Sequence, residues 1–435
     1  MRLAVLAYGS QGDVRPFLAL GQGLREVGHT VWVVTDPGFR QAAEAAGLEH
    51  RPIQGNVQAI LAERHGLSAL TGNPLRLVSL MRRLGRELAP AWARDTLAGC
   101  RDAEALVAGN AASFLAASVA ERWRLPLVQG WLQPIAPTAA FTSSVLPPLP
   151  LSGSAARLTH GLMRHLVWLG MRDAANAMRD ILELSRWPGA AAAWAAMDRW
   201  PAFCAVSPAL VPRPADWPPA ASMTGFLFLD TREQPEPALC AFVEAGEPPI
   251  YIGFGSMVAR DPGRATRACL DAIARVGRRA VVAVGWGGLD RDALTAARLS
   301  GAALHLVESA PHEWLLPRVA AAVHHGGAGT TAAVLRAGVP SVVVPFLGDQ
   351  FFWAARLRRA GAAPSPVPAR RLSAGRLAIA LDRALSDAAM RGRAAAMGEA
   401  IRAENGIAGA VRVVERAIET TALVRAARQA SSAPP

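Results

Sequence analysis

A short apolar run that ends in two histidines opens the segment of this chain with the clearest chemical pattern. Residues 323–331 read Val-His-His-Gly-Gly-Ala-Gly-Thr-Thr, and such small residues let a strand turn tightly into a helix, here expected to begin at Thr330. This kind of turn aims unpaired backbone N–H groups and the positive end of a helix dipole at one point, where an anion can bind. A second apolar run, residues 341–344, brings Asp349 and Gln350 to the same edge. The spacing therefore predicts a phosphate site with a polar pair beside it, although a purely structural crossover has the same glycines.

A carboxylate near the N-terminus is the second chemical feature. Asp13 stands in the segment Gly-Ser-Gln-Gly-Asp-Val-Arg-Pro, residues 9–16, which we expect to be a loop followed by a helix from Pro16 to Val27. A loop after the first strand of an open α/β sheet borders the ligand-binding edge, and a carboxylate there can accept a proton from an alcohol. An aspartate three residues before Pro16 also suits a helix cap. The residues by themselves leave both interpretations open.

Both halves of the chain alternate strand and helix, which predicts two doubly wound parallel sheets. The expected strands are 3–7, 31–35, 105–108 and 127–129 in the first half, and then 280–284, 303–307, 320–324 and 341–344 after a run at 250–252. We divide the chain into a first domain (1–211), a proline-rich linker (212–235), a second domain (236–400), a helix that packs back on the first domain (401–423) and a disordered tail (424–435).

Composition narrows the class of protein. The 435 residues are 51% hydrophobic and 18% charged, which excludes wholesale disorder and suits two domains. The net charge is +12, yet every basic residue other than histidine is arginine, so the charge reflects compositional bias or attraction to anionic partners such as a membrane surface or a phosphate-bearing substrate. No basic–aromatic pattern of a nucleic-acid binder is present. The four scattered cysteines and the absence of a leader-like run indicate a cytoplasmic protein.

These motifs together resemble the family 1 glycosyltransferases, above all the sterol glucosyltransferases and the bacterial natural-product glucosyltransferases. The resemblance rests on the loop around Asp13, the run 310–315, the histidine turn 323–331 and the run 346–352, and weaker similarity extends over most of the chain. It implies the GT-B architecture, in which two Rossmann-like domains face each other across a cleft. It further implies an inverting enzyme that moves a hexose, with glucose expected, from a UDP-sugar to a hydroxyl of a hydrophobic acceptor.

The same resemblance assigns roles to residues. Asp13 is expected to be the catalytic base, in a loop where Gln11 replaces the family's arginine. The remaining assignments are His325, Ser256, Gly329, Thr330 and Ser10 at the donor diphosphate, Trp286 and His312 at the nucleotide, and Asp349 and Gln350 at the sugar. The Asp-Arg-Asp run at 290–292 looks like the metal motif of the other glycosyltransferase fold, but it stands where a helix should begin. We therefore expect neither a metal nor another cofactor.

The sequence evidence for the acceptor site is weaker. Trp131, Phe141 and Trp168 are apolar candidates for an acceptor pocket, and residues 152–184 predict long amphipathic helices that form core, an acceptor lid or a membrane-facing surface. Sterol, lipid and polyketide acceptors all stay open. The alternatives to a transferase are a catalytically silent homologue that binds a nucleotide sugar or an apolar ligand, and a nucleotide-sugar epimerase.

Overall fold

The computed structural model describes residues 1–54, 74–230, 233–285, 288–301 and 303–432. Within these residues, parallel strands form one sheet of seven strands in the order β3-β2-β1-β4-β5-β6-β7 and one of five in the order β10-β9-β8-β11-β12. The strands are β1 (Arg2–Leu6), β2 (Thr30–Thr35), β3 (Glu49–Pro52), β4 (Ala105–Gly109), β5 (Leu127–Trp131), β6 (Ala202–Cys204), β7 (Ala221–Met223), β8 (Ile250–Gly253), β9 (Ala280–Ala283), β10 (Leu304–Val307), β11 (Ala321–His324) and β12 (Ser341–Val343).

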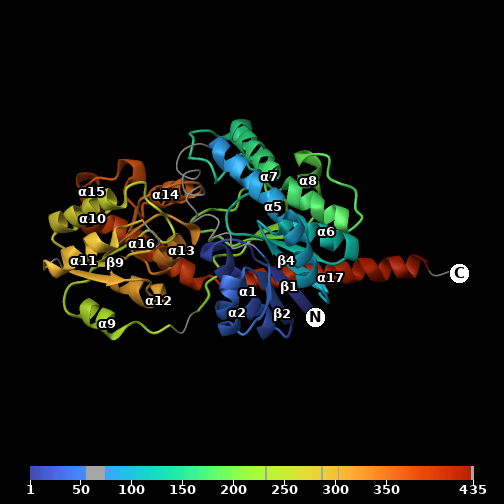
Figure 1. Ribbon diagram of the computed structural model, residues 1–435, viewed down its shortest axis with the longest axis horizontal. Coiled ribbons are helices and arrows are strands. Elements are labelled where there is room, and N and C mark those ends of the chain that lie inside the picture. The colour runs from blue at the N-terminus through green and yellow to red at the C-terminus, as the bar shows by residue number, and fades with distance from the viewer. Residues whose placement is uncertain (55–73, 231–232, 286–287, 302, 433–435) are drawn as a thin grey trace.

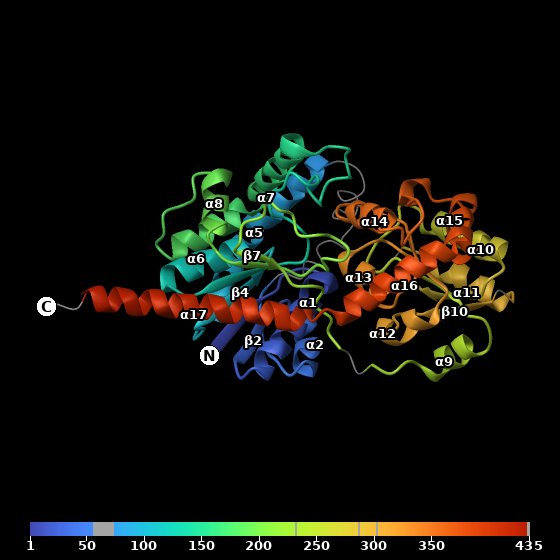
Figure 2. The same ribbon diagram turned by 180° about the vertical axis from the view of Figure 1, so that it is seen from behind.

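Helices cover both sheets, and the two halves lie side by side (Figure 1; Figure 2 shows the opposite face). The helices of the first half are α1 (Gln11–Glu26), α2 (Arg40–Ala45), α5 (Pro74–Cys100), α6 (Ser113–Trp123), α7 (Gly153–Ile181) and α8 (Ala190–Met197). Those that follow are α9 (Pro237–Glu244), α10 (Pro262–Val276), α11 (Arg291–Leu299), α12 (His312–Leu315), α13 (Ala328–Arg336), α14 (Gln350–Arg359), α15 (Ala374–Ser386), α16 (Ala388–Ala403) and α17 (Gly406–Ser432). The predicted fold class, two α/β halves that each carry a parallel sheet, is confirmed.

Nine of the strands in the described residues form where the sequence predicts them, because each is a largely apolar run. β3, β6 and β7 were not predicted: β3 is polar, with the sequence Glu-His-Arg-Pro, and β6 and β7 have three residues each. All residues of β4 and β5 are buried, as expected for parallel strands that carry helices on both faces. The core of the first half packs β1 and β2 against α1, with Phe17 and Leu20 fully inside. The second half has its own core between β8, β9, α10 and α15. Each half of the molecule therefore has its own hydrophobic core.

A further apolar cluster joins the halves. It contains Trp131 and Trp217 from the first half and Phe352 and Trp353 from α14, all less than one-tenth exposed. The α13 and α14 helices lie on the side of the second sheet that faces the first, in both ribbon views. The position of these two helices brings the chemistry of the second half next to the first.

The structure draws three boundaries differently from the sequence. β7 (Ala221–Met223) extends the first sheet inside the segment expected to be the linker, 212–235. The last helix begins at Gly406, where the Asn405 side chain accepts a hydrogen bond from the Ala408 amide, and it returns to α1. It also continues to Ser432, so the expected loss of structure after residue 423 was wrong. Polar, low-complexity ends do not exclude a helix once its first turns are packed.

Candidate active site between the two sheets

The carboxyl ends of the two sheets meet. A hydrogen bond of 3.1 Å joins the Gln133 amide, after β5, to the Asp349 carboxylate, after β12. The negative charge of Asp13, in the first turn after β1, acts on the same Asp349 carboxyl and contributes to its raised pKa. Ligands of open α/β sheets bind at such carboxyl edges. Residues predicted from separate motifs are thereby brought to one place.

Asp13 lies in the first turn of α1 and not in the preceding loop, so the predicted helix start at Pro16 was wrong. The helix begins at Gln11 because Ser10 and Asp13 cap it together: the Ser10 backbone N–H and hydroxyl both donate to Asp13 Oδ2, at 2.8 Å each. Such pairing satisfies N–H groups that the first turn would otherwise leave unpaired. The structural interpretation of Asp13 is correct, and it is compatible with a chemical one.

The environment of Asp13 makes its carboxyl a stronger proton acceptor than an exposed aspartate. Burial raises the pKa of Asp13, and the two hydrogen bonds from Ser10 oppose that rise. Both bonds go to Oδ2, so Oδ1 has no hydrogen-bond donor among the described residues. One oxygen is anchored and the other is available, which is the arrangement that a positioned general base requires.

The turn between β11 and α13 has the geometry of an anion site. α13 begins at Ala328, two residues before the expected start, with Gly327 as its N-cap. Gly326 adopts a φ of 87°, and a Cβ there would lie 2.7 Å from Val343 Cγ1, so this position requires glycine. The backbone N–H groups in the first turn of α13, which includes Thr330, have no partner within the helix. Because Gly326 carries no side chain, it does not block the approach of a ligand to these N–H groups.

The two histidines of this turn have different surroundings. His324 is buried and its Nδ1 accepts a hydrogen bond of 3.1 Å from the Gly326 amide, so it holds the turn. His325 has a buried Nδ1 with no partner among the described residues. Burial, followed by the nearby His312 charge, lowers the pKa of His325 to about 4, which leaves its imidazole neutral at pH 7. An unpartnered buried nitrogen of this kind is satisfied when a ligand arrives.

Ser256 lies in a second glycine turn that touches the first. A Cβ on Gly255, which has a φ of 58°, would stand 3.2 Å from His325 Cε1. Ser256 follows that glycine and is exposed. The turns after β8 and β11 are therefore neighbours, as a shared diphosphate site requires, and a role for Ser256 in that site stays a prediction.

Asp349 is the most constrained member of the predicted sugar pair. Its Oδ2 accepts hydrogen bonds from Trp353 Nε1 (2.8 Å) and Gln133 Nε2 (3.1 Å). Burial raises the pKa of this carboxyl, and the charge of Asp13 raises it further. Two carboxyls with raised pKa values thus lie within electrostatic range of each other, a pattern that is common at functional sites.

Gln350 has a structural task in this structure. Its side chain is 4% exposed, and its Oε1 accepts hydrogen bonds from the backbone amides of Phe346 (2.7 Å) and Leu347 (3.2 Å). The amide therefore shapes the loop that carries Asp349. Its predicted contact with a sugar stays a prediction.

The Asp-Arg-Asp run has the structural role that its position predicts. Asp290 caps α11, and its Oδ1 accepts a hydrogen bond of 3.1 Å from the Ala293 amide. Across the described ranges, no group of three or more His, Cys, Asp or Glu side chains could hold a metal ion. No described helix combines the length and the hydropathy that crossing a membrane requires.

Two family models match the two halves of this chain. Residues 3–125 match the glycosyltransferase family 28 N-terminal domain, and residues 267–416 match the erythromycin biosynthesis protein CIII-like C-terminal domain. O-mycaminosyltylonolide 6-deoxyallosyltransferase of Streptomyces fradiae is 35% identical over 97% of this chain and 98% of its own length. The chain belongs to the GT-B glycosyltransferases. The predicted resemblance and the predicted class of enzyme are confirmed at the level of this family.

Other relatives of this glycosyltransferase are longer. Sterol 3-beta-glucosyltransferase UGT80A2 of Arabidopsis thaliana is 34% identical over 95% of this chain, which spans 65% of the plant protein. Among solved structures, the glycotransferase of kitacinnamycin has a TM-score of 0.70 at 18% identity, covering 96% of this chain and 99% of its own. The glycosyltransferase VinC, solved with dTDP, has a TM-score of 0.68 at 17% identity and covers 97% and 100%. These two structures support the fold.

The residues predicted to hold the nucleotide are only partly described in this glycosyltransferase. His312 starts α12 and its Nε2 lies 3.3 Å from the Tyr251 hydroxyl. Burial, with a contribution from the Arg15 charge on α1, lowers the pKa of His312 to about 4. Trp286 lies outside the described residues. The Ser10 hydroxyl donates to Asp13 Oδ2, and its predicted contact with the diphosphate stays a prediction.

The three apolar residues predicted for an acceptor pocket have different surroundings. Trp168 is 4% exposed and packs against Phe114 and Trp187, with ring centroids 5.7 and 6.2 Å away. It belongs to the core between α6, α7 and α8, so its assignment to a pocket was wrong: the apolar face of α7 is packed on other helices. Trp131 lies in the cluster that joins the halves, and its buried Nε1 lacks a partner among the described residues.

Phe141 is the acceptor candidate that meets the second half. Its ring centroid lies 5.6 Å from that of Phe352 on α14, and the Arg356 guanidinium lies 4.5 Å from the Phe141 centroid. Gln133 and Arg356 were missed in the sequence because each acts through a partner from a distant segment. Trp353, which bonds to Asp349 four residues before it, was missed although its partner is local. The signal available was the spacing of 349, 353 and 356, which places them on one face of a helix.

Proposed function

We propose that this glycosyltransferase moves a hexose, with glucose the expected sugar, from a UDP-sugar to a hydroxyl of a hydrophobic acceptor, with inversion and without a metal. The observation that carries the proposal is the Gln133–Asp349 hydrogen bond across the junction of the two sheets, which brings Asp349 within electrostatic range of Asp13. One carboxyl has a free oxygen for the acceptor proton, and the other lies beside the turn with the anion-site geometry.

In the proposed reaction Asp13 Oδ1 takes the proton from the acceptor hydroxyl while that oxygen attacks the anomeric carbon. The bond from this carbon to the diphosphate oxygen breaks, and UDP leaves with the electron pair. A single displacement of this kind inverts the anomeric configuration. The burial of Asp13 raises its pKa and so strengthens it as a base.

The leaving diphosphate would be stabilised by the amides at the start of α13 and by His325. Fixed N–H donors that point at developing negative charge supply a large part of the catalytic effect in many enzymes. Because its pKa is lowered to about 4, His325 binds as a neutral hydrogen-bond donor and not as a cation. Ser256 in the adjoining turn would add a hydroxyl donor.

The names of the relatives bear on substrates. One is a glucosyltransferase of sterols and another transfers 6-deoxyallose to O-mycaminosyltylonolide. A structural neighbour was solved with dTDP, so dTDP-glucose belongs beside UDP-glucose in any test of the donor. The cluster of Trp131, Phe141 and Phe352 where the halves meet supports a hydrophobic acceptor.

The exposed face of α7 supports a peripheral membrane contact as part of the proposal. Leu158 and Leu162, one turn apart, are 74% and 54% exposed, and such side chains can enter the interfacial layer of a bilayer. Arg157 and Arg164 add no free charge, because each forms an ion pair with an aspartate. Sedimentation with phosphatidylcholine vesicles that Leu158→Ser weakens would support this contact, and recovery in the supernatant would contradict it.

The test of the proposed function is release of UDP from UDP-glucose across a panel of sterols, lipids and polyketide aglycones. Wild type should turn over at least one acceptor, and Asp13→Asn should be slower by about 10²–10⁴-fold. Asp271→Asn, the same change at an exposed position of α10, serves as the matched control. Equal rates for wild type and Asp13→Asn would contradict the role of Asp13, and conversion of UDP-glucose to another UDP-sugar without acceptor would indicate an epimerase.

A further inference from the structure

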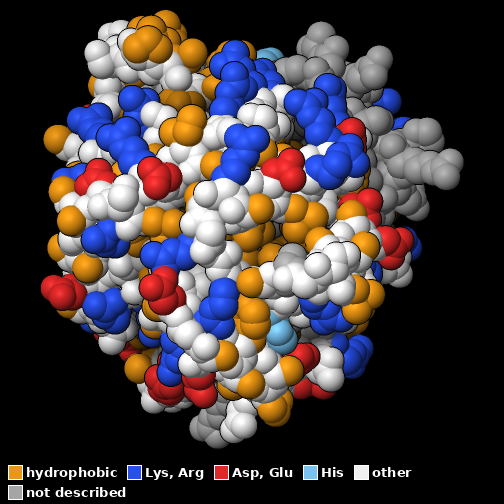
Figure 3. Space-filling view, turned by 90° about the vertical axis from the view of Figure 1, so that its left-hand side faces the viewer, with side chains coloured by type: hydrophobic (Ala, Val, Ile, Leu, Met, Phe, Trp, Pro, Cys, Tyr) orange, Lys and Arg blue, Asp and Glu red, His pale blue; other side chains and the backbone are white. Residues whose placement is uncertain are grey.

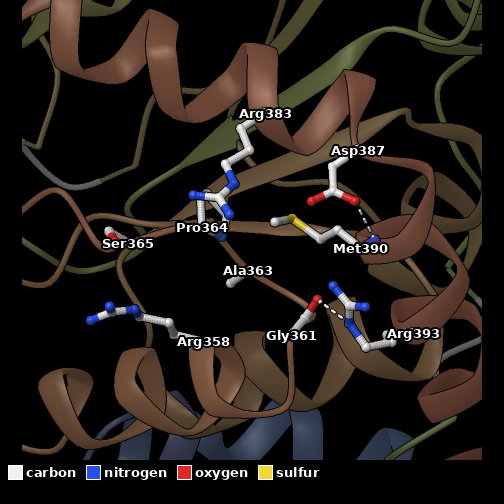
Figure 4. Close-up of a pocket in the computed structure, with 9 residues that line it drawn as sticks. All are labelled: Arg358, Gly361, Ala363, Pro364, Ser365, Arg383, Asp387, Met390 and Arg393. Carbon is white, nitrogen blue, oxygen red and sulfur yellow. Dashed lines mark hydrogen bonds between the residues drawn. The ribbon is translucent and has the colours of Figure 1, made fainter.

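A pocket of about 240 Å³ opens on the second half of the molecule, away from the junction of the sheets (Figure 4). Its walls come from the end of α14, the segment that follows it, the last turn of α15 and the first turns of α16. α14 starts at Gln350, with Asp349 as its N-cap, and ends at Arg359, and ten helical residues rise about 15 Å. The pocket therefore lies at the opposite end of α14 from the candidate active site.

Arginines dominate the lining of this pocket. Arg358, Arg383 and Arg393 contribute guanidinium groups, and Asp387 is the one carboxylate among the described residues that line it. Arg383 and Arg393 approach the space around Met390 from opposite sides in Figure 4. Arginines also gather over the upper part of this end of the molecule, as the blue side chains in Figure 3 show. The balance of lining charges is positive.

The charges of the lining are not neutralised within the protein. Asp387 caps α16, with its Oδ1 accepting a hydrogen bond of 2.8 Å from the Met390 amide. Arg393 donates through Nε to the Gly361 carbonyl at 3.1 Å. This bond orients the side chain and leaves its two terminal nitrogens available to a ligand. Arg358 and Arg383 accept hydrogen bonds only through their backbone carbonyls, and their guanidinium groups have no hydrogen bond or ion pair to a described residue. Side chains that converge on one space without a counter-charge favour an anionic ligand.

We propose that this pocket binds a phosphate group. Arginine forks match the oxygens of phosphate with paired hydrogen bonds, and three of them exceed what one carboxylate can accept. The volume is below the 300–1,000 Å³ that is usual for drug-sized ligands, so the pocket fits a phosphate with a small substituent and not a whole nucleotide sugar. Its cationic lining also excludes the hydrophobic acceptor.

The phosphate group can come from two sources. A soluble phosphate or phosphate monoester would enter alone, and the headgroup of a phospholipid would enter from a membrane surface. Both present the same oxygens to the same arginines. The chemistry of the pocket is therefore one proposal, and the source is decided by experiment.

The test titrates inorganic phosphate into the full-length chain by calorimetry at constant ionic strength. Excess UDP is present, so that phosphate binding in the candidate active site is suppressed. We expect saturable binding to wild type and an affinity lower by about tenfold or more in the double variant Arg358→Gln/Arg383→Gln, since hydrogen bonds to charged groups are lost. Arg412→Gln, the same change at an exposed position of α17, should bind as wild type does.

Absence of saturable binding, or equal affinity in the double variant and wild type, would overturn the proposal. An equal loss in Arg412→Gln would do the same, because it would indicate screening by overall charge. Circular dichroism checks that each variant is folded, and the single variant Arg383→Gln replaces the double one if that fails to fold. Arg383 is exposed, so its replacement leaves the core intact.

Vesicles distinguish the two sources. Wild type is sedimented with phosphatidylcholine vesicles that contain or lack phosphatidic acid. Recruitment by phosphatidic acid that the double variant loses assigns the pocket to a lipid headgroup. Phosphate binding without such recruitment assigns it to a soluble ligand. Recruitment that all variants share takes place elsewhere on the surface and overturns the lipid source.

Discussion

The two halves of this glycosyltransferase build their parts of the site in different ways. In the second half, Ser256, His325 and Asp349 each follow a strand within a short turn, and glycines with positive φ set the geometry. In the first half Asp13 lies in the first turn of α1, but Gln133 and Phe141 lie on the long connection between β5 and α7. Under the proposed function, backbone turns would bind most of the donor and side chains on a loop would bind the acceptor. Turn geometry is encoded locally, whereas loop shape depends on what packs against it.

Among substitutions in the second half, replacement of His325 should cause the largest loss of catalytic rate. We expect His325→Ala to lower the rate by about 10²–10³-fold, because it removes a donor aimed at the leaving diphosphate. The measurement is kcat with UDP-glucose at saturating acceptor. His165→Ala on α7, an exposed histidine, is the control. A His325→Ala rate within twofold of wild type would show that the leaving group is stabilised elsewhere.

The Gln133–Asp349 bond tests whether the halves act together. Asp349→Asn should raise KM for the sugar donor about 10- to 100-fold, as expected when hydrogen bonds to a charged group are lost. Gln133→Leu should have a smaller effect, and the double variant should be no worse than Asp349→Asn, since both changes remove the same bond. Purely additive effects on the free energy of binding would show that the two side chains are independent in the working enzyme.

Replacement of Ser10 should have the smallest effect on activity, and it should act on the pH dependence. Its hydroxyl donates to Asp13 Oδ2 and so lowers the pKa of that carboxyl, against the rise caused by burial. In Ser10→Ala the pKa of Asp13 should rise further. A base acts only when it is deprotonated, so the acidic limb of kcat/KM should move to higher pH while the rate at the plateau changes little. An acidic limb at the same or a lower pH would mean that a group other than Asp13 controls it.

How well each part of the structure could be predicted from the sequence depends on the same difference between local turns and long loops. The nine predicted strands were located to within about two residues because parallel strands are almost continuously apolar. The polar β3 and the three-residue strands β6 and β7 were missed. The turn at 323–331 was recognisable because its glycines are required by backbone conformation, as Gly326 illustrates. The start of α1 was misplaced because hydrophobic periodicity begins after the cap, and the Ser10–Asp13 pairing that sets the start is polar.

Contacts between distant segments could not be predicted from the sequence. The hydrogen bond between Gln133 and Asp349 joins residues 216 apart, and no local pattern connects them. Trp168 was misassigned for a related reason: an aromatic on an amphipathic helix looks the same whether its face meets a ligand or another helix. Gln350 was predicted at the sugar, and no local pattern indicated that its amide would bond to the loop around it.

Binding of UDP to wild type, Asp13→Asn and His325→Ala, measured by titration calorimetry, tests the division between the halves most directly. If the first half supplies the base and the second holds the nucleotide, Asp13→Asn should bind UDP as wild type does, although it turns over far more slowly. His325→Ala should bind UDP about tenfold more weakly or worse. A loss of UDP affinity in Asp13→Asn that equals the loss in His325→Ala, or unchanged binding in His325→Ala, would contradict the account.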